Sequence, residues 1–197
     1  PGAPAPWRED PLTESTTQPR ERKAPRQRPA RSPIESAPRQ PAAEEAWTQF
    51  TGRLVMALAA LEEDEHLLLQ VKGTNRYVQF MDQGGYGMRA ETVSDYYLPE
   101  DEHLGEEDYR YLMKLGWHAP TLVPGTSDEG ADGSPNYHLD LARPLPLEDM
   151  AVMAVLTLIH VHRASHPGEL EYDARSSGGM SIRFPHLIIR RRVAVGR

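Results

Sequence analysis

The sequence contains no cysteine, which excludes disulfides, thiolate nucleophiles and cysteine-ligated metal. Aromatic residues are scarce, at 7%, and the longest apolar stretch, residues 150–159, is too short to cross a bilayer. Residues 1–30 lack the apolar core of a signal peptide. These absences predict a cytoplasmic protein with no membrane segment.

Large apolar side chains are almost missing from residues 1–41, which hold ten of the 18 prolines. A stretch of this composition cannot bury enough surface to offset the entropy of ordering it. We therefore expect residues 1–41 to form a disordered Pro- and Arg-rich arm. Residues 42–175 are long enough to build one core, and residues 176–197 are expected to form an edge strand or a basic tail.

Charge is divided along the same boundaries. The arm carries eight basic and five acidic residues, residues 42–189 carry ten basic and 24 acidic residues, and four arginines lie at the C-terminal end. A strongly acidic body repels phosphate, which argues against binding to nucleic acid through the folded part. A nucleic-acid-associated regulator acting through the arm stays as an alternative, with a solvated linker as the simpler interpretation.

Apolar spacing predicts the secondary structure. Helices are expected after Pro41, over residues 106–115 with Gly116 at the end, and over residues 147–162. Strands are expected at 66–72, 76–81 and 87–93, joined by short glycine-bearing turns, and at 137–141, 169–173 and within 187–195. The fold class is therefore α+β, with an antiparallel sheet of three to five strands and helices packed on one face, in the order helix, meander, helix, strand, helix, strand.

Strand parity separates two faces of the predicted meander. One is apolar, whereas the other mixes Tyr77, Gln79, Met81, Arg89 and Glu91 with aliphatic residues. A half-apolar sheet face that no predicted helix covers suits a peptide or a second subunit. With the aromatic residues of the following loops added, the candidate peptide-binding residues are Tyr77, Gln79, Met81, Arg89, Glu91, Tyr96, Tyr97, Trp117 and Tyr137.

Catalytic motifs are weak. His160 and His162 point to opposite sides of a helix, so only His162, His166 and Glu169 remain as a metal set, and a small metal-dependent hydrolase is the resulting alternative. The repeated EDEHL segments at 63–67 and 100–104 are better explained as solvated acidic loops. The glycines at 84, 85 and 87 lie between two strands, which predicts a hairpin turn, and no GxSxG elbow exists. We expect no enzyme activity, cofactor or metal.

Several short segments carry a family resemblance: YVQF at 77–80, RAETVS at 89–94, LGWHAPT at 115–121, GSPNY at 133–137, and HPG at 166–168 followed by LEY at 170–172. In this order and spacing they resemble the actinobacterial TY-Chap domain, which is related in fold to type III secretion chaperones and YbjN-like proteins. The resemblance covers roughly residues 45–175 and implies a non-catalytic, secretion-chaperone-like module. Its implied partner is a protein or peptide client, held on the sheet face or along the groove of the first helix, with the homodimer common among the chaperone relatives as the implied assembly.

Overall fold

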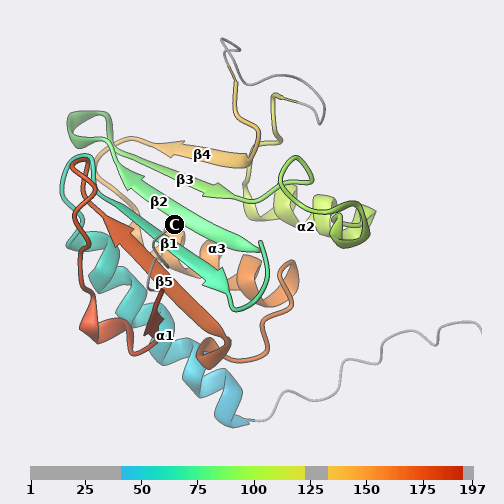
Figure 1. Ribbon diagram of the computed structural model, residues 1–197, viewed down its shortest axis with the longest axis horizontal. Helices are drawn as coiled ribbons and strands as arrows, with labels where there is room; N and C mark the ends of the chain where they lie inside the picture. The colour runs from blue at the N-terminus through green and yellow to red at the C-terminus, as the bar shows by residue number, and fades with distance from the viewer. Residues whose placement is uncertain (1–40, 123–132, 193–197) are drawn as a thin grey trace, which may run out of the picture. The chain divides into compact units, whose positions relative to one another are not determined.

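The computed structural model describes residues 41–122 and 133–192, so the predicted arm lies outside the described residues. Figure 1 shows a sheet with helices behind it. The elements in chain order are α1 (Pro41–Ala59), β1 (His66–Val71), β2 (Tyr77–Asp82), β3 (Met88–Thr92), α2 (Glu106–Leu115), β4 (Tyr137–Leu141), α3 (Leu147–His160), β5 (Leu170–Arg175) and β6 (Arg190–Arg191).

The six strands form one sheet in the order β4-β3-β2-β1-β5-β6. Neighbouring strands are antiparallel except for β5 and β6, which are parallel. The predicted meander and the α+β class are confirmed, but the prediction of three to five strands was one strand too low. Strand β6 lies within the predicted range 187–195 and at the edge of the sheet, but it contains only two residues.

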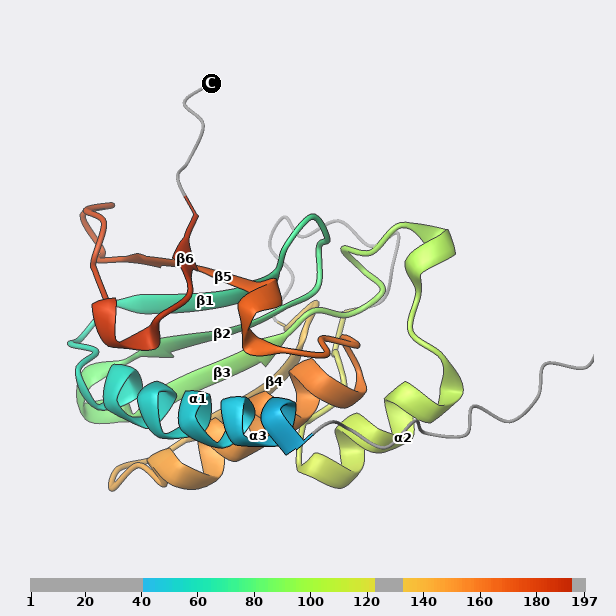
Figure 2. The same cartoon turned by 90° about the horizontal axis from the view of Figure 1, so that it is seen from below.

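Helices α1 and α3 pack side by side on one face of the sheet, with α2 near the end of β3 (Figures 1 and 2). The apolar stripe predicted for the first helix is confirmed, since all five of its members are buried: Trp47, Phe50, Leu54, Leu58 and Leu61. Helix α3 supplies the second half of this layer through Met150, Ala154 and Leu158. The helix ends at His160, two residues before the predicted end, and Val152 on its outer side is 47% exposed.

Two glycines are required where the sequence predicted turns. Gly116 ends α2 with a positive φ of 100°, and its N–H reaches back to the carbonyl of Met113 at 3.1 Å. Gly87 follows the turn between β2 and β3 with a φ of 109°, and a Cβ there would lie 1.9 Å from the carbonyl oxygen of Leu141. The second glycine therefore allows β3 to approach β4 closely.

The C-terminal segment packs onto the domain after β5. Phe184 and Leu187 are 3% and 0% exposed, and the Phe184 N–H donates to the Tyr172 hydroxyl at 3.1 Å. A 3₁₀ turn at Pro185–Leu187 then leads into β6, at the edge beside β5. Within the described part of the chain no helix is long and apolar enough to cross a membrane.

Candidate functional site

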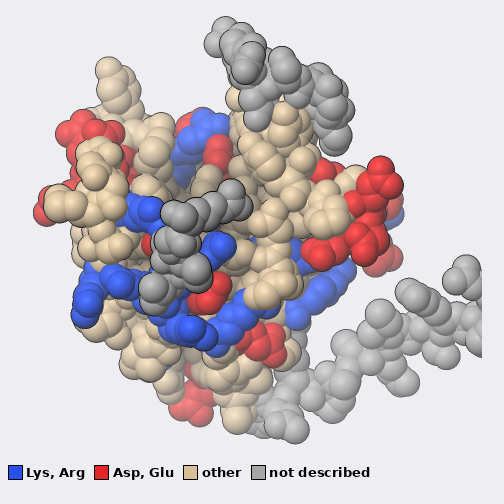
Figure 3. Space-filling model, in the orientation of Figure 1, with Lys and Arg blue, Asp and Glu red and all other residues tan. Residues whose placement is uncertain are grey.

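Among the described residues no helix covers the second face of the sheet, which we call the open face. Figure 2 shows α1 and α3 on the opposite side, and Figure 3 looks onto the open face, where both basic and acidic side chains are visible. Strand register places its residues in rows across neighbouring strands. One row runs Arg175–His66–Met81–Arg89–Asp140, and the next runs Asp173–Leu68–Gln79–Glu91–His138.

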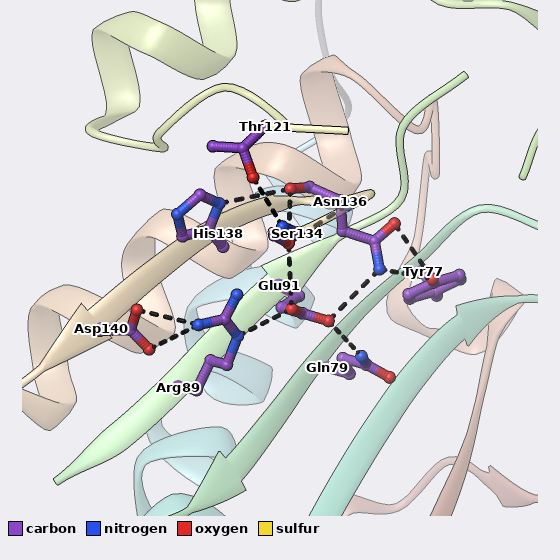
Figure 4. A network of polar contacts seen from close by, with 9 residues as sticks. All are labelled: Tyr77, Gln79, Arg89, Glu91, Thr121, Ser134, Asn136, His138 and Asp140. Atoms are coloured by element: carbon purple, nitrogen blue, oxygen red, sulfur yellow. Dashed lines mark hydrogen bonds and ion pairs between the residues drawn. The ribbon is translucent and has the colours of Figure 1, made fainter. Parts of the chain in front are cut away.

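Glu91 is the centre of a polar network on this face (Figure 4). Its Oε1 accepts from Arg89 Nε at 2.8 Å, and its Oε2 accepts from Gln79 Nε2 at 2.7 Å and from Asn136 Nδ2 at 3.3 Å. Arg89 in turn donates from a terminal nitrogen to both carboxylate oxygens of Asp140, at 2.9 and 3.0 Å. The network therefore ties β2, β3 and β4 together through side chains as well as through the backbone.

Electrostatics in the network favour a charged Glu91. Burial alone would raise the pKa of the Glu91 carboxyl, but hydrogen bonds from Arg89, Gln79 and Asn136 outweigh burial and lower the pKa. Burial raises the pKa of Tyr77 to about 12, so its hydroxyl remains protonated beside Asn136. Arg89 faces the two carboxylates of Glu91 and Asp140, so its charge is fully paired and one net negative charge remains on this part of the open face.

The segment just before β4 positions the amide of the network. Ser134 Oγ donates to the carbonyl of Asn136 at 3.0 Å, and the Ser134 N–H donates to Thr121 Oγ1 at 2.7 Å. The backbones of His118 and His138 also pair, with N···O distances of 2.9 and 3.1 Å. These contacts hold Asn136 so that its Nδ2 reaches both Glu91 and the Tyr77 hydroxyl, the latter at 3.1 Å.

A hollow of about 400 Å³ lies on the open face beside this network. The side chain of Met81 is 39% exposed there, between His66 and Arg89 in the register. Large hydrophobic side chains that remain exposed within a polar rim are typical of binding surfaces. The lining residues are His66, Gln79, Phe80, Met81, Arg89 and Glu91.

The residues predicted from the sequence divide into three groups. Tyr77, Gln79, Met81, Arg89 and Glu91 lie together on the open face, as strand parity required. Tyr96 and Tyr137 line a separate pocket at the end of the sheet, and Tyr97 is 41% exposed next to Tyr96. Trp117 lies in the core with 0% exposure, and its indole N–H donates to Thr157 Oγ1 at 2.9 Å, so we leave it out of the proposed surface.

Sequence reasoning missed four residues of the site: His66, Ser134, Asn136 and Asp140. Parity indicated neither Ser134 nor Asn136, because both precede β4 and reach the network through a turn. Asp140 lies on β4 directly opposite Arg89 of β3. The sequence does not show which residues of these two strands pair, so this contact could not be predicted.

The residues of the alternative metal site do not converge. His162 is buried and its Nε2 contacts Thr92 Oγ1 at 2.8 Å, whereas His166 Nδ1 accepts from the Gly168 N–H at 2.9 Å. Glu169 is exposed and accepts from the Ser165 N–H at 2.9 Å. Among residues 41–122 and 133–192 no group of three His, Asp or Glu side chains is placed to hold a metal ion.

Replacing Glu91 with Ala is expected to lower the free energy of unfolding by about 2–3 kcal/mol, because Arg89, Gln79 and Asn136 all lose an acceptor. Urea unfolding at pH 7 measures the change. Asp140→Ala is the matched control, since this carboxylate is 54% exposed and its removal should cost about 0.5 kcal/mol. Equal costs for the two variants would contradict a central role for Glu91.

His162 predicts a pH dependence of stability. Burial, and next the nearby charge of Arg76, lower its pKa to about 3, and its Nδ1 has no hydrogen-bond partner in the described structure. The unfolded chain gains a proton on this residue below pH 6.5 that the native state does not accept, so stability present above pH 6.5 is lost as the pH falls toward 3. Between pH 7 and pH 5 the loss should be about 2 kcal/mol.

The variant His162→Gln isolates this contribution, because its amide can still donate near the position of Nε2. Urea unfolding of both proteins from pH 7 to pH 5 should show a flatter dependence in the variant. Parallel pH dependences would show that His162 is protonated equally in the folded and unfolded states.

A sheet with helices on one side and, on the other, an open face with a hollow around an exposed methionine is typical of a binding domain. Residues 40–176 match the family model TY-Chap3, described as T3SS (YopN, CesT) and YbjN peptide-binding chaperone 3. The chain therefore belongs to this family of peptide-binding chaperones. Comparisons with curated proteins and with solved structures give no match.

Proposed function

We propose that this domain is a non-catalytic chaperone module that holds a peptide segment of a client protein on its open sheet face. The observation that carries the proposal is the hollow around the exposed Met81 side chain, beside a polar network in which Arg89 is already paired with two carboxylates. Family membership supports peptide binding as the activity. An apolar side chain of the client would enter the hollow and displace water from Met81.

The network gives the client polar contacts without demanding a charge. Gln79 donates its side-chain N–H to Glu91, and Figure 4 shows its side-chain oxygen pointing away from that contact. This oxygen is a suitable acceptor for a backbone N–H of the client. Because Arg89 is paired with Glu91 and Asp140, the client needs no acidic group to pair with Arg89.

A second candidate binding site for the client is the groove between α1 and α3, about 350 Å³ in volume. It is lined by Trp47, Val152 and Ile159 among others, and Glu44 lies at its rim. An amphipathic helix would suit such a groove. We favour the sheet face because its hollow combines the exposed Met81 side chain with oriented polar groups, whereas the groove is mainly apolar.

Selection of peptides from a random dodecapeptide display library on the full-length chain tests the proposal. Enriched peptides should share an apolar residue and bind the chain in solution, as measured by fluorescence anisotropy of the labelled peptides. Failure to enrich any sequence would contradict peptide binding. Enriched peptides that bind a Val152→Gln variant poorly and a Met81→Gln variant normally would move the binding site to the helical groove.

A further inference from the structure

A second pocket, about 220 Å³ in volume, lies at the end of the sheet where the chain leaves β3 for α2. It is separate from the hollow at Met81 and shares no lining residue with it. Its walls are mostly aromatic and aliphatic, with one carboxylate. The lining residues are Ser94, Asp95, Tyr96, Tyr109, Pro120, Leu122 and Tyr137.

Three tyrosine rings from different parts of the chain line this pocket. Tyr109 of α2 and Tyr137 of β4 are stacked, with ring centroids 6.5 Å apart and an interplanar angle of 23°. Tyr96 comes from the segment after β3 and packs edge-on against Tyr97, 4.9 Å between centroids. Burial raises the pKa of Tyr137 to about 12, and the hydrogen bond to Asp95 raises the pKa of Tyr109, so both rings stay neutral. Neutral aromatic rings attract cations placed over their faces.

Asp95 adds a negative charge to these walls. Its Oδ1 accepts from the Leu104 N–H at 2.8 Å, and its Oδ2 accepts from the Tyr109 hydroxyl. These contacts fix the carboxylate in place but do not neutralise it. Among the described residues no arginine, lysine or histidine lies within 4.0 Å of Asp95.

Among the described residues, this lack of a cationic partner distinguishes Asp95 from the other buried or half-buried aspartates. Asp82 pairs with Arg143 at 2.6 Å, Asp108 with Arg163 at 2.7 Å, and Asp173 with Arg175 at 2.9 Å. Arg76 donates to backbone carbonyls, those of Glu102 and Val161, at 2.7 and 3.3 Å.

The surroundings of the pocket reinforce the negative potential. The 3₁₀ turn Glu100–Glu102 and the first turn of α2 carry six carboxylates within a short segment, and Figure 3 shows the resulting acidic surface over the α2 side of the domain. Such a field attracts cations and disfavours anions.

From these observations we infer that the tyrosine pocket binds a cationic side chain, lysine or arginine, of the client; this inference rests on the proposed function. The aliphatic stem would pack against Pro120 and Leu122, and the charged end would lie against the tyrosine rings and Asp95. The segment 134–137 connects this pocket to the open face, because Asn136 belongs to the Glu91 network and Tyr137 to the pocket. A client that fills both sites carries an apolar residue and a basic residue.

The test uses small probes that report on the pocket without the sheet face. N-acetyl-lysine methylamide and N-acetyl-arginine methylamide are titrated into the full-length chain, with N-acetyl-norleucine methylamide as the uncharged isostere of lysine. NMR signals of the tyrosine rings are followed. The cationic probes should give saturable shifts at Tyr96, Tyr109 and Tyr137, with at least fivefold weaker binding of the norleucine probe.

Asp95→Asn should weaken binding of the lysine probe at least fivefold while keeping an acceptor for the Leu104 N–H. Tyr96→Leu, which leaves Asp95 intact, should weaken it as well, and the matched control Asp140→Asn on the open face should not. Equal binding of the norleucine and lysine probes would show a purely apolar pocket and overturn the inference, as would the absence of shifts with every probe. Because the probes do not involve Met81, such a result would leave the sheet-face proposal to be judged by the peptide selection.

Discussion

Replacing Trp117 with Ala is expected to lower the free energy of unfolding by about 3–5 kcal/mol, the largest stability effect of any substitution considered for this domain. The indole is fully buried, so its removal creates a cavity that the surrounding core can fill only in part. The loss also removes the hydrogen bond from the indole N–H to Thr157 Oγ1. Urea-induced unfolding followed by circular dichroism measures the change.

Tyr86→Ala is the matched control for this prediction. Tyr86 is another large aromatic side chain, but it is 90% exposed, and its removal should change the unfolding free energy by less than about 0.5 kcal/mol. A cost below about 1 kcal/mol for the Trp117 variant would mean that the indole is not part of the core. In that case Trp117 would return as a candidate for contact with a client.

Replacing Met81 with Gln is expected to weaken binding of library-selected peptides at least tenfold. Burying a methionine side chain against an apolar partner contributes about 1.5–3 kcal/mol, and a glutamine of similar length adds the cost of desolvating its amide. Gln is neutral, so it leaves the ion pairs of Arg89 with Glu91 and Asp140 in place. Fluorescence anisotropy of a labelled selected peptide gives the Kd of each variant.

The controls for this variant use exposed apolar residues elsewhere. Met113 on α2 is 52% exposed and Val152 on α3 is 47% exposed, and replacing either with Gln should change the Kd less than twofold. The unfolding free energy of the Met81 variant should stay within about 1 kcal/mol of the original, because this side chain is already partly solvated. If the Met81 variant binds the selected peptide with unchanged affinity, the hollow is excluded as the client-binding site.

Much of the fold could be predicted because its elements are locally consistent. The buried residues of α1 recur at helical spacing, the strands of the meander alternate, and Gly116 ends α2 where a left-handed residue was expected. The short strand β6 was predicted only as part of the wider range 187–195, because two residues are too few to show alternation. Its pairing with β5 depends on the packing of Phe184 and Leu187, which brings the chain back to the edge of the sheet.

Strand parity predicted only those residues of the candidate site that lie on strands β2 and β3. Parity placed Gln79, Met81 and Glu91 on one face, but it gave no information on loop residues such as Asn136. Composition was equally uninformative for Trp117, since an aromatic residue in a loop segment fits a core and a surface equally well. Whether Asn136 and Trp117 lie in the site or in the core depends on contacts between residues far apart in the sequence.

The central claim is that the client lies on the open sheet face, and the seven methionines of the chain provide reporters for it. Labelling the methionine methyl groups with ¹³C and adding an unlabelled selected peptide allows intermolecular nuclear Overhauser effects to be measured without any substitution. We predict such effects between the peptide and the methyl group of Met81, with none at Met56 on α1 or Met113 on α2, although both are more exposed. Effects at Met56 or Met113 with none at Met81 would contradict the account.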